Sequence, residues 1–232
     1  MTKAISAGLK SHLALENTTL ATCYRITLRN QVPKITGITQ NNPGVVTTDQ
    51  DHLLTTGDQV QLDDIVGMTA LNNNHYTVTV LTATTFQINV DTTAFSAYTS
   101  GGEVRLTFGY TNIDQDIDFE GITYKAAEGS VPSDFRNNTN MSVSDVEMLT
   151  SYVASVTVSE ADIHNGKLDY AEAESFLINY ENTALGKLVL IRGFTGEMKL
   201  HRGHYVNSVT SLSTKFVSDT IKVVTPECQH NL

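Results

Sequence analysis

The sequence predicts a mainly β fold, a β-rich α+β protein, and three observations predict it. Thr, Ser and Asn are plentiful, whereas long Ala/Leu/Glu/Lys stretches are missing; the former suit pleated surfaces and turns. Short runs of alternating apolar and polar residues recur, with Gly, Pro and Asn between them. Forty per cent of the 232 residues are hydrophobic, which is enough for a sizeable core in one or two domains.

The N-terminal segment predicts a helix followed by a strand. Over residues 3–15, Ile5, Leu9 and Leu13 follow the spacing of an amphipathic helix, and Thr2 is its expected N-cap. The run LATCYRITLR at 20–29 then alternates in character along its length. This alternation predicts a strand that is buried on one face.

A change of composition marks residues 33–104 as an inserted module. Thr, Val, Asn, Gly and Asp dominate there, and basic residues are few. Short β-type runs (KITGI, VVTT, QVQL, HYTVTVL and TTFQINV) are separated by turn signals, the last of which is Ser100-Gly101-Gly102. The spacing predicts a small antiparallel β-barrel or sandwich.

Strands are also expected after the module. RLTFGY at 105–110 should pair with LATCYRITLR, and DIDFEGITYKA predicts a hairpin with its turn at Glu120-Gly121. SEADIHNG predicts a short helix, and the other predicted strands are SVSDVEML, AEAESFLINY, KLVLIRGFTGEMKLH, HYVNSVTSL and FVSDTIKVV. We therefore expect one discontinuous domain of barrel or sandwich type, residues 1–32 plus 105–232, with short helices and with the module at 33–104.

The charge of the chain argues against binding of nucleic acid. The net charge is −10, and the 15 basic residues form no cluster, whereas affinity for phosphate depends on clustered Lys and Arg. This does not exclude a surface that faces DNA, because an acidic wall lets a polyanion pass without binding it. No apolar run is long enough for a signal peptide or a membrane span, so we expect a soluble protein made in the cytoplasm.

The candidate sites favour structural explanations. Asp114, Asp116 and Asp118 have the alternate spacing of a Ca²⁺ loop, but Phe119 and Lys125 stand where such a loop needs Gly and Glu. We expect the three carboxylates to form a solvent-facing row on one strand face.

The histidines and cysteines likewise do not assemble a recognisable site. The spacing of His201 and His204 does not place both on one strand face, and His164 falls in the short helix. Cys23 and Cys228 match no metal-binding pattern, although Cys228 and His230 could contribute to a metal site shared with a partner chain. No nucleophile elbow, phosphate loop or acid/base pair occurs, so we expect no enzyme, no catalytic or cofactor-binding residue and no metal ligand.

The module resembles the FCCH-type β module of ubiquitin-activating enzymes. The resemblance runs through HLLTTGDQV at 52–60, VGMTALN at 66–72, TATTF at 82–86 and YTSGG at 98–102, all in order. Such modules recur in phage tail and particle proteins, where they look like surface decorations. The resemblance implies a small β domain and no ubiquitin chemistry.

The remainder resembles a family of phage tail-tip hub and minor tail proteins, which includes the hub of gene-transfer-agent particles and the lambda-type minor tail protein L. TTLATCYRITLR is similar to the family's opening, and residues 111–126 match its T-D-x-D-x-D-x-x-F-x-G-x-x-Y-x-A run at Asp114, Asp116, Phe119, Gly121, Tyr124 and Ala126. VSEADIHNGKLDYAEA at 158–173, Ile178–Asn182 and Arg192–Glu197 continue the resemblance.

Longer relatives carry further cysteines that look like iron–sulfur ligands. Here the chain reads Pro226, Cys228 and Leu232 and then stops. A cubane cluster needs about four thiolates, and one is present in this region. The resemblance therefore implies no iron–sulfur cluster and no other cofactor in this chain.

The resemblance implies a structural hub at the tail tip of a virion, assembled in the host cytoplasm. Its expected role is to connect the tail tube and distal tail ring to the central tip, with the distal tail protein, the central tip protein and the tape measure protein as partners. Tube rings are sixfold and tips are often threefold, so a homotrimer is expected, with DNA passing through the lumen. An alternative is a carbohydrate- or receptor-binding module with Phe95 and Tyr98 as an exposed platform; a cell-wall hydrolase is weakened by the missing acid/base pair.

Overall fold

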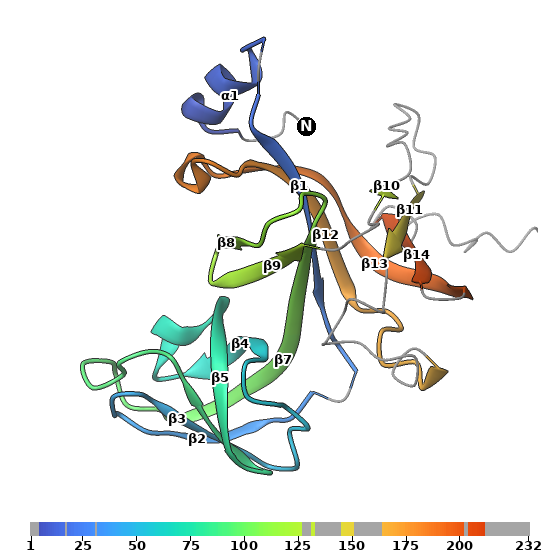
Figure 1. Ribbon diagram of the computed structural model, residues 1–232. Coiled ribbons are helices and arrows are strands. Elements are labelled where there is room, and N and C mark those ends of the chain that lie inside the picture. The colour runs from blue at the N-terminus through green and yellow to red at the C-terminus, as the bar shows by residue number, and fades with distance from the viewer. Residues whose placement is uncertain are drawn as a thin grey trace, which may run out of the picture.

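The structure, a computed structural model, describes residues 5–16, 18–30, 32–126, 131–132, 145–150, 164–201 and 204–211. Their strands form one connected sheet in the order β10-β11-β14-β13-β12-β1-β7-β4-β5-β6-β3-β2, with the β8–β9 hairpin attached to β7 (Figure 1). The mainly β prediction is confirmed. The elements are α1 (Ala7–Leu13), β1 (Leu20–Thr27), β2 (Ile35–Ile38), β3 (Val45–Thr48), β4 (Gln59–Val66), η1 (Thr69–Leu71), β5 (Asn74–Thr82), β6 (Thr85–Ile88), β7 (Ser100–Thr111), β8 (Ile117–Phe119), β9 (Ile122–Ala126), β10 (Val131–Pro132), β11 (Asp145–Thr150), β12 (Glu172–Asn179), η2 (Thr183–Leu185), β13 (Lys187–His201) and β14 (His204–Ser211).

Strand β1 lies at the centre of this sheet, between β7 and β12. Its pairing with β7 confirms the expected contact between LATCYRITLR and RLTFGY. The expectation that β1 is buried on one face only is wrong, because six of its eight residues are buried. Cys23 packs on one face with Tyr124 and Phe176, and Ile26 packs on the other with Phe108.

The β8–β9 hairpin covers the Cys23 face of the sheet. Both residues of its predicted turn have positive φ (Glu120 51°, Gly121 75°), as a type I′ turn requires. Strand β9 runs parallel to β7 and places Tyr124 beside Gly109, where a Cβ on Gly109 would collide with the Tyr124 ring. This packing explains why a strand with alternating sequence is buried on both sides.

The module is a strongly curved antiparallel sheet around its own apolar core. Strands β2 to β6 and the first half of β7 enclose Val46, Leu62, Met68, Phe86 and Ile88, all of them fully buried. A single bridge between Lys34 and Glu103 brings the start of β2 back to β7. Among the described strands this bridge is isolated, so the expected barrel is not closed by a continuous ladder.

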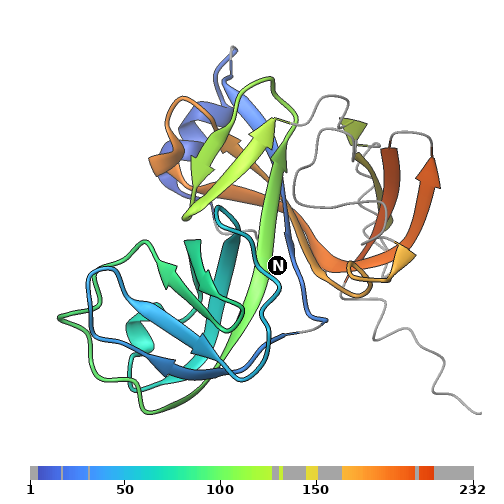
Figure 2. The ribbon, with the colours of Figure 1, turned by 60° about the horizontal axis from the view of Figure 1, so that its bottom comes forward.

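Strand β7 belongs to both parts of the molecule. It pairs with β4 over Ser100–Thr107 and with β1 over Thr107–Thr111, and Figure 2 shows it running from the module into the main sheet. The turn expected at Ser100-Gly101-Gly102 is therefore wrong: these residues begin the strand. Gly101 and Gly102 have φ of 73° and 101°, and a Cβ on Gly102 would lie 2.9 Å from Ile35 and Ile65 side-chain atoms.

The C-terminal strands follow the sequence prediction closely. β12, β13 and β14 form an antiparallel meander, and β11 pairs with β14. The strand predicted at 216–224 and residues 159–163 of the predicted short helix lie outside the described residues. The first helix is shorter than expected: it begins after Ser6, whose Oγ accepts a hydrogen bond from the Leu9 N–H (3.1 Å), and ends at Leu13.

Candidate functional site

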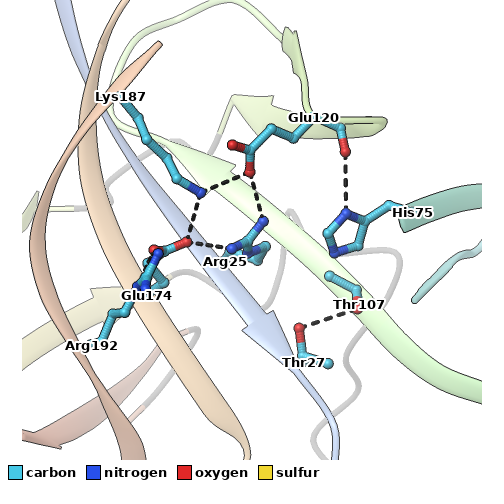
Figure 3. A network of polar contacts seen from close by, with 8 residues as sticks. All are labelled: Arg25, Thr27, His75, Thr107, Glu120, Glu174, Lys187 and Arg192. Carbon is cyan, nitrogen blue, oxygen red and sulfur yellow. Dashed lines mark hydrogen bonds and ion pairs between the residues drawn. The ribbon is translucent and has the colours of Figure 1, made fainter. Parts of the chain in front are cut away.

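A network of five charged side chains lies where the module meets the main sheet (Figure 3). Arg25 on β1, Glu174 on β12 and Arg192 on β13 are register partners on three adjacent strands, so they point to the same face of the sheet. Lys187 on β13 and Glu120 in the β8–β9 turn complete the network.

Glu174 is the anion at the centre of this network. Its side chain is 7% exposed and forms ion pairs with Arg25, with Lys187 (3.1 Å) and with Arg192 (2.5 Å). Burial alone would raise its pKa, but the three cations outweigh burial and hold the pKa below its usual value. Glu174 is therefore ionised at neutral pH and fixes the three basic side chains around it.

Glu120 connects the same network to the module. Its carboxylate accepts from Arg25 (3.0 Å) and from Lys187 (2.7 Å), while its backbone carbonyl accepts from His75 Nδ1 on β5 (3.2 Å). Because Nδ1 donates, Nε2 is the nitrogen without a proton in the neutral ring. Nε2 is buried and has no hydrogen-bond partner among the described residues.

His75 is consequently held in its neutral form. Burial is the main reason that its pKa is lowered to about 4, and the charge of Arg25 lowers it further. A second contact lies beside it: the Thr123 N–H donates to Gln59 Oε1 of β4 (3.2 Å). The hairpin of the main sheet therefore rests directly on strands β4 and β5 of the module.

Two open pockets lie on either side of Arg25, and Arg25 and Gln61 line both of them. One, of about 350 Å³, lies between β1, β4, β12 and β13 and includes Thr27, Arg192 and Phe194 in its wall. The other, of about 560 Å³, lies between β4, β5 and the β8–β9 turn and includes His75 and Glu120. The polar junction is thus a concave surface that a partner molecule can enter.

The aspartates singled out in the sequence do not form a metal site. Asp114, Asp116 and Asp118 are exposed as expected, but only Asp118 lies on a strand, so they do not form one row on a strand face. Asp116 is paired with Lys125 (2.6 Å), and Asp118 accepts from the Thr123 hydroxyl (2.6 Å). Within the described residues, no group of three or more His, Cys, Asp or Glu side chains could hold a metal ion.

The remaining candidates are dispersed. Cys23 is a free, fully buried thiol, and His164 is exposed. His201 and His204 lie on different strands, β13 and β14, where they are register partners at the end of the hairpin. The sequence argument treated their spacing as that of two residues on one strand, so it does not describe this arrangement. Cys228 and His230 lie outside the described residues.

The aromatic platform required by the receptor-binding alternative is absent at the expected residues. Phe95 and Tyr98 are partly buried against the module core. The Tyr98 hydroxyl donates to the backbone carbonyls of Ile35 (2.8 Å) and Gly101 (3.0 Å). Both rings therefore stabilise the module instead of facing solvent as a stacking surface.

The charged junction was missed by reasoning from the sequence. Arg25 and Glu174 are 149 positions apart, and neither lies in a motif of known chemistry. The sequence offered one usable signal: Arg25 and Glu174 are charged residues within segments that are predicted to be strands. It contains no indication of which strands become neighbours.

Comparison with known proteins identifies the family of the chain. Residues 102–232 match the family described as baseplate hub protein, N-terminal attachment domain, and residues 41–107 match the FCCH domain of ubiquitin-activating enzyme E1. No curated protein matches significantly.

Solved structures with a similar fold include a chain of a phage-like particle. A chain of the virion of a native gene transfer agent particle is similar over 97% of this chain, with 17% identity and a TM-score of 0.52. The match covers 51% of that chain, so this protein spans about half of its length. Within the part of the chain that the structure describes, no helix is long and apolar enough to cross a membrane. Since the hub family matches more than half of the sequence, the chain belongs to the baseplate hub proteins, structural components of the virion tail, and it carries their N-terminal attachment domain together with an FCCH-type module.

Proposed function

We propose that this chain joins the tail tube and distal tail ring to the central tip of the tail, as a ring of three copies. The observation that carries the proposal is the match of residues 102–232 to the attachment domain of baseplate hub proteins. The likeness in fold to a chain of a gene transfer agent virion agrees with it. On this proposal, the attachment domain binds the distal tail ring on one side and the central tip on the other.

The expected partners are the distal tail protein, the central tip protein and the tape measure protein. A ring between a sixfold tube and a threefold tip needs cyclic symmetry, and each of its subunits needs extended contact surfaces. Support comes from the long connected sheet, which runs from β2 in the module to β10 at its other end.

The main sheet is proposed to face the lumen, with the module on the outside of the ring. The match to baseplate hub proteins and the polar, basic-poor composition of residues 33–104 support this orientation. Figures 1 and 2 show the module on one side of the main sheet, attached at β7. It can therefore project outwards while the main sheet forms the ring.

The chain is proposed to act by binding and not by catalysis. At the junction, both carboxylates of the network are paired with cations, and His75 is neutral with one nitrogen already donating. No arrangement there resembles a nucleophile beside a general base.

Cryo-electron microscopy of intact particles tests the proposal. We expect three copies in a ring next to the distal tail protein, with β1 and β12 near the lumen and the module outside. Six copies, or a module buried between two rings, would contradict it.

A further inference from the structure

The ring of His75 forms part of the contact between the module and the main sheet. It lies on β5, and its Nδ1 donates to the backbone carbonyl of Glu120 in the β8–β9 turn over 3.2 Å (Figure 3). Because a carbonyl oxygen can only accept, Nδ1 carries the proton of the neutral ring, and Nε2 is bare. Nε2 is buried and has no hydrogen-bond partner among the described residues. The closed contact therefore accommodates the neutral ring.

A second proton on the ring has no acceptor in this place. A protonated histidine donates from both nitrogens, and Nε2 would become a buried, charged donor. An unpaired donor of this kind costs more free energy than an unpaired neutral acceptor, because a charge is taken out of water with it. Protonation of His75 is therefore opposed as long as the contact stays closed.

The charged groups that face His75 oppose protonation as well. Arg25 on β1 and Lys187 on β13 are cations, and the Glu120 carboxylate beside them is shared by both. Strand β4 contributes neutral Gln61, the register partner of His75. Burial lowers the pKa of His75 to about 4, and Arg25 and Lys187 act in the same direction, whereas Glu120 acts against them.

The other charged groups on this side of the sheet are paired among themselves. Glu174 on β12 holds Arg192 of β13 in addition to the two cations of the junction. Arg105 on β7 is paired with Asp63 of β4 (3.2 Å) and with Glu103 (3.0 Å). These carboxylates are therefore already engaged and do not supply a partner for a charged His75.

Few hydrogen bonds hold the module against the hairpin. Among the described residues, they are the bond from His75 to Glu120 and the bond from the Thr123 N–H to Gln59 Oε1, each 3.2 Å long. This length is at the upper end of the usual range. Gly121 adds a close backbone approach to the His75 carbonyl. Loss of the His75 contact therefore removes a large part of the attachment.

Strand β7 provides an axis about which the module can turn. Thr107 is the register partner of Gln59 on β4 and of Thr27 on β1, so the two ladders meet at this residue. Strand β4 lies between β7 and β5, which places His75 to one side of that axis. The twist between neighbouring strands varies over roughly 10–35°. A change of twist near Thr107 can therefore move His75 away from the hairpin while both ladders persist.

We propose that this contact is an acid-sensitive latch: uptake of a proton at His75 Nε2 separates the module from the β8–β9 hairpin, and the module then turns about β7. In the open state the charged ring reaches water, while Arg25, Lys187 and Glu120 keep their mutual pairs on the main sheet. Acid thus changes the direction in which the module projects, without unfolding either part.

Distances between two spin labels, measured by double electron–electron resonance at pH 7 and pH 4, test the latch. The labels are attached through Ser96→Cys in the module and Glu181→Cys beyond β12, both at exposed positions. Cys228→Ser removes one native thiol, and Cys23 is fully buried and does not react. The ratio of open to closed molecules should rise roughly a hundredfold from pH 7 to pH 4, as the pKa values of about 4 and 6.5 require.

Two histidine variants identify the group that responds. His75→Gln keeps a side-chain donor for the Glu120 carbonyl but does not titrate, so its distances at pH 4 should equal those at pH 7. His164→Gln is the matched control, because His164 is exposed and lies far along the chain from the junction, and it should open as the unsubstituted protein does. Circular dichroism at both pH values should show unchanged strand content.

Three results would overturn the latch. One is an unchanged distance distribution between pH 7 and pH 4. Another is opening of His75→Gln to the same extent as the unsubstituted chain, which would assign the effect to the carboxylates. The third is loss of the strand signal at pH 4, because the chain would then unfold as a whole. Nuclear magnetic resonance of the His75 ring needs no variant at this position: proton uptake and the change in distance must share one pH midpoint, and separate midpoints would also refute the latch.

Discussion

Glu174 is a single residue on which three basic side chains depend. Replacing Glu174 by Ala leaves Arg25 and Lys187 largely buried without their central carboxylate, and breaking one partner of a buried pair costs about 3–5 kcal/mol. We expect a loss of free energy of unfolding in that range, measured by urea denaturation. Glu172→Ala is the control: its pair with Arg29 is exposed on both sides, so the loss should be below about 1 kcal/mol. Equal losses in the two variants would contradict the central role of Glu174.

His75 makes the stability of the junction depend on pH. Its pKa is about 4 in the folded protein against 6.5 for the unfolded reference, so the unfolded chain binds more protons between these values. Stability should be complete above about pH 6.5 and should fall as the pH drops towards 4, by at most about 3 kcal/mol.

The measurement for His75 is the free energy of unfolding at several pH values between 4 and 7. His75→Gln removes the titrating ring and leaves the other histidines unchanged, so its curve should be flatter over this range. Parallel curves for the two proteins would show that His75 does not titrate in this way.

Cys23 cannot serve as a metal ligand in the folded chain. It is fully buried, and burial raises the pKa of its thiol to about 12, so the thiolate that a cluster needs does not form. We expect no stoichiometric iron or zinc after anaerobic purification. Metal found in washed particles and lost in Cys228→Ser would reveal an intersubunit site instead.

The conformation of the β8–β9 turn sets how closely the module packs against the main sheet. Gly121 has φ of 75°, and a Cβ there would lie 2.8 Å from the backbone oxygen of His75. Gly121→Ala should therefore destabilise by about 1–3 kcal/mol, the sum of backbone strain and a displaced module. Gly186→Ala has a similar φ of 83° but an open surrounding, so its smaller loss measures the backbone strain alone. Equal melting temperatures for the two variants would contradict the close contact.

Elements with local signals were predictable from the sequence, and elements defined by distant contacts were not. The Glu120-Gly121 hairpin and strands β12 to β14 follow from alternation and turn residues. Ser100-Gly101-Gly102 has the composition of a turn, yet it begins a strand because it pairs with β4, and close packing against Ile35 favours glycine at position 102. The Arg25–Glu174–Arg192 row depends on the register of three strands, which no local pattern contains.

At the scale of the whole molecule, we propose the division into residues 1–32 and 105–232 with the module at 33–104. The two ends of the module meet in the structure: the Val104 N–H donates to the Pro33 carbonyl over 3.0 Å. A short linker that replaces residues 34–104 therefore costs little loop entropy, and Thr107–Thr111 keeps its pairing with β1.

We expect the shortened chain to unfold cooperatively, as followed by circular dichroism. It should be somewhat less stable than the intact protein, because the hairpin loses its contacts with His75 and Gln59. Non-cooperative unfolding would show that the module is part of the main core, and the division would then be wrong.

The passage of β7 from the module into the centre of the sheet also has a mechanical consequence. Hydrogen bonds in an antiparallel ladder run perpendicular to the strands, so a pull along β7 loads its bonds to β1 together, in shear, instead of breaking them one after another. If the module lies outside the ring as proposed, a force applied to it is carried along β7 to the strands at the centre of the subunit.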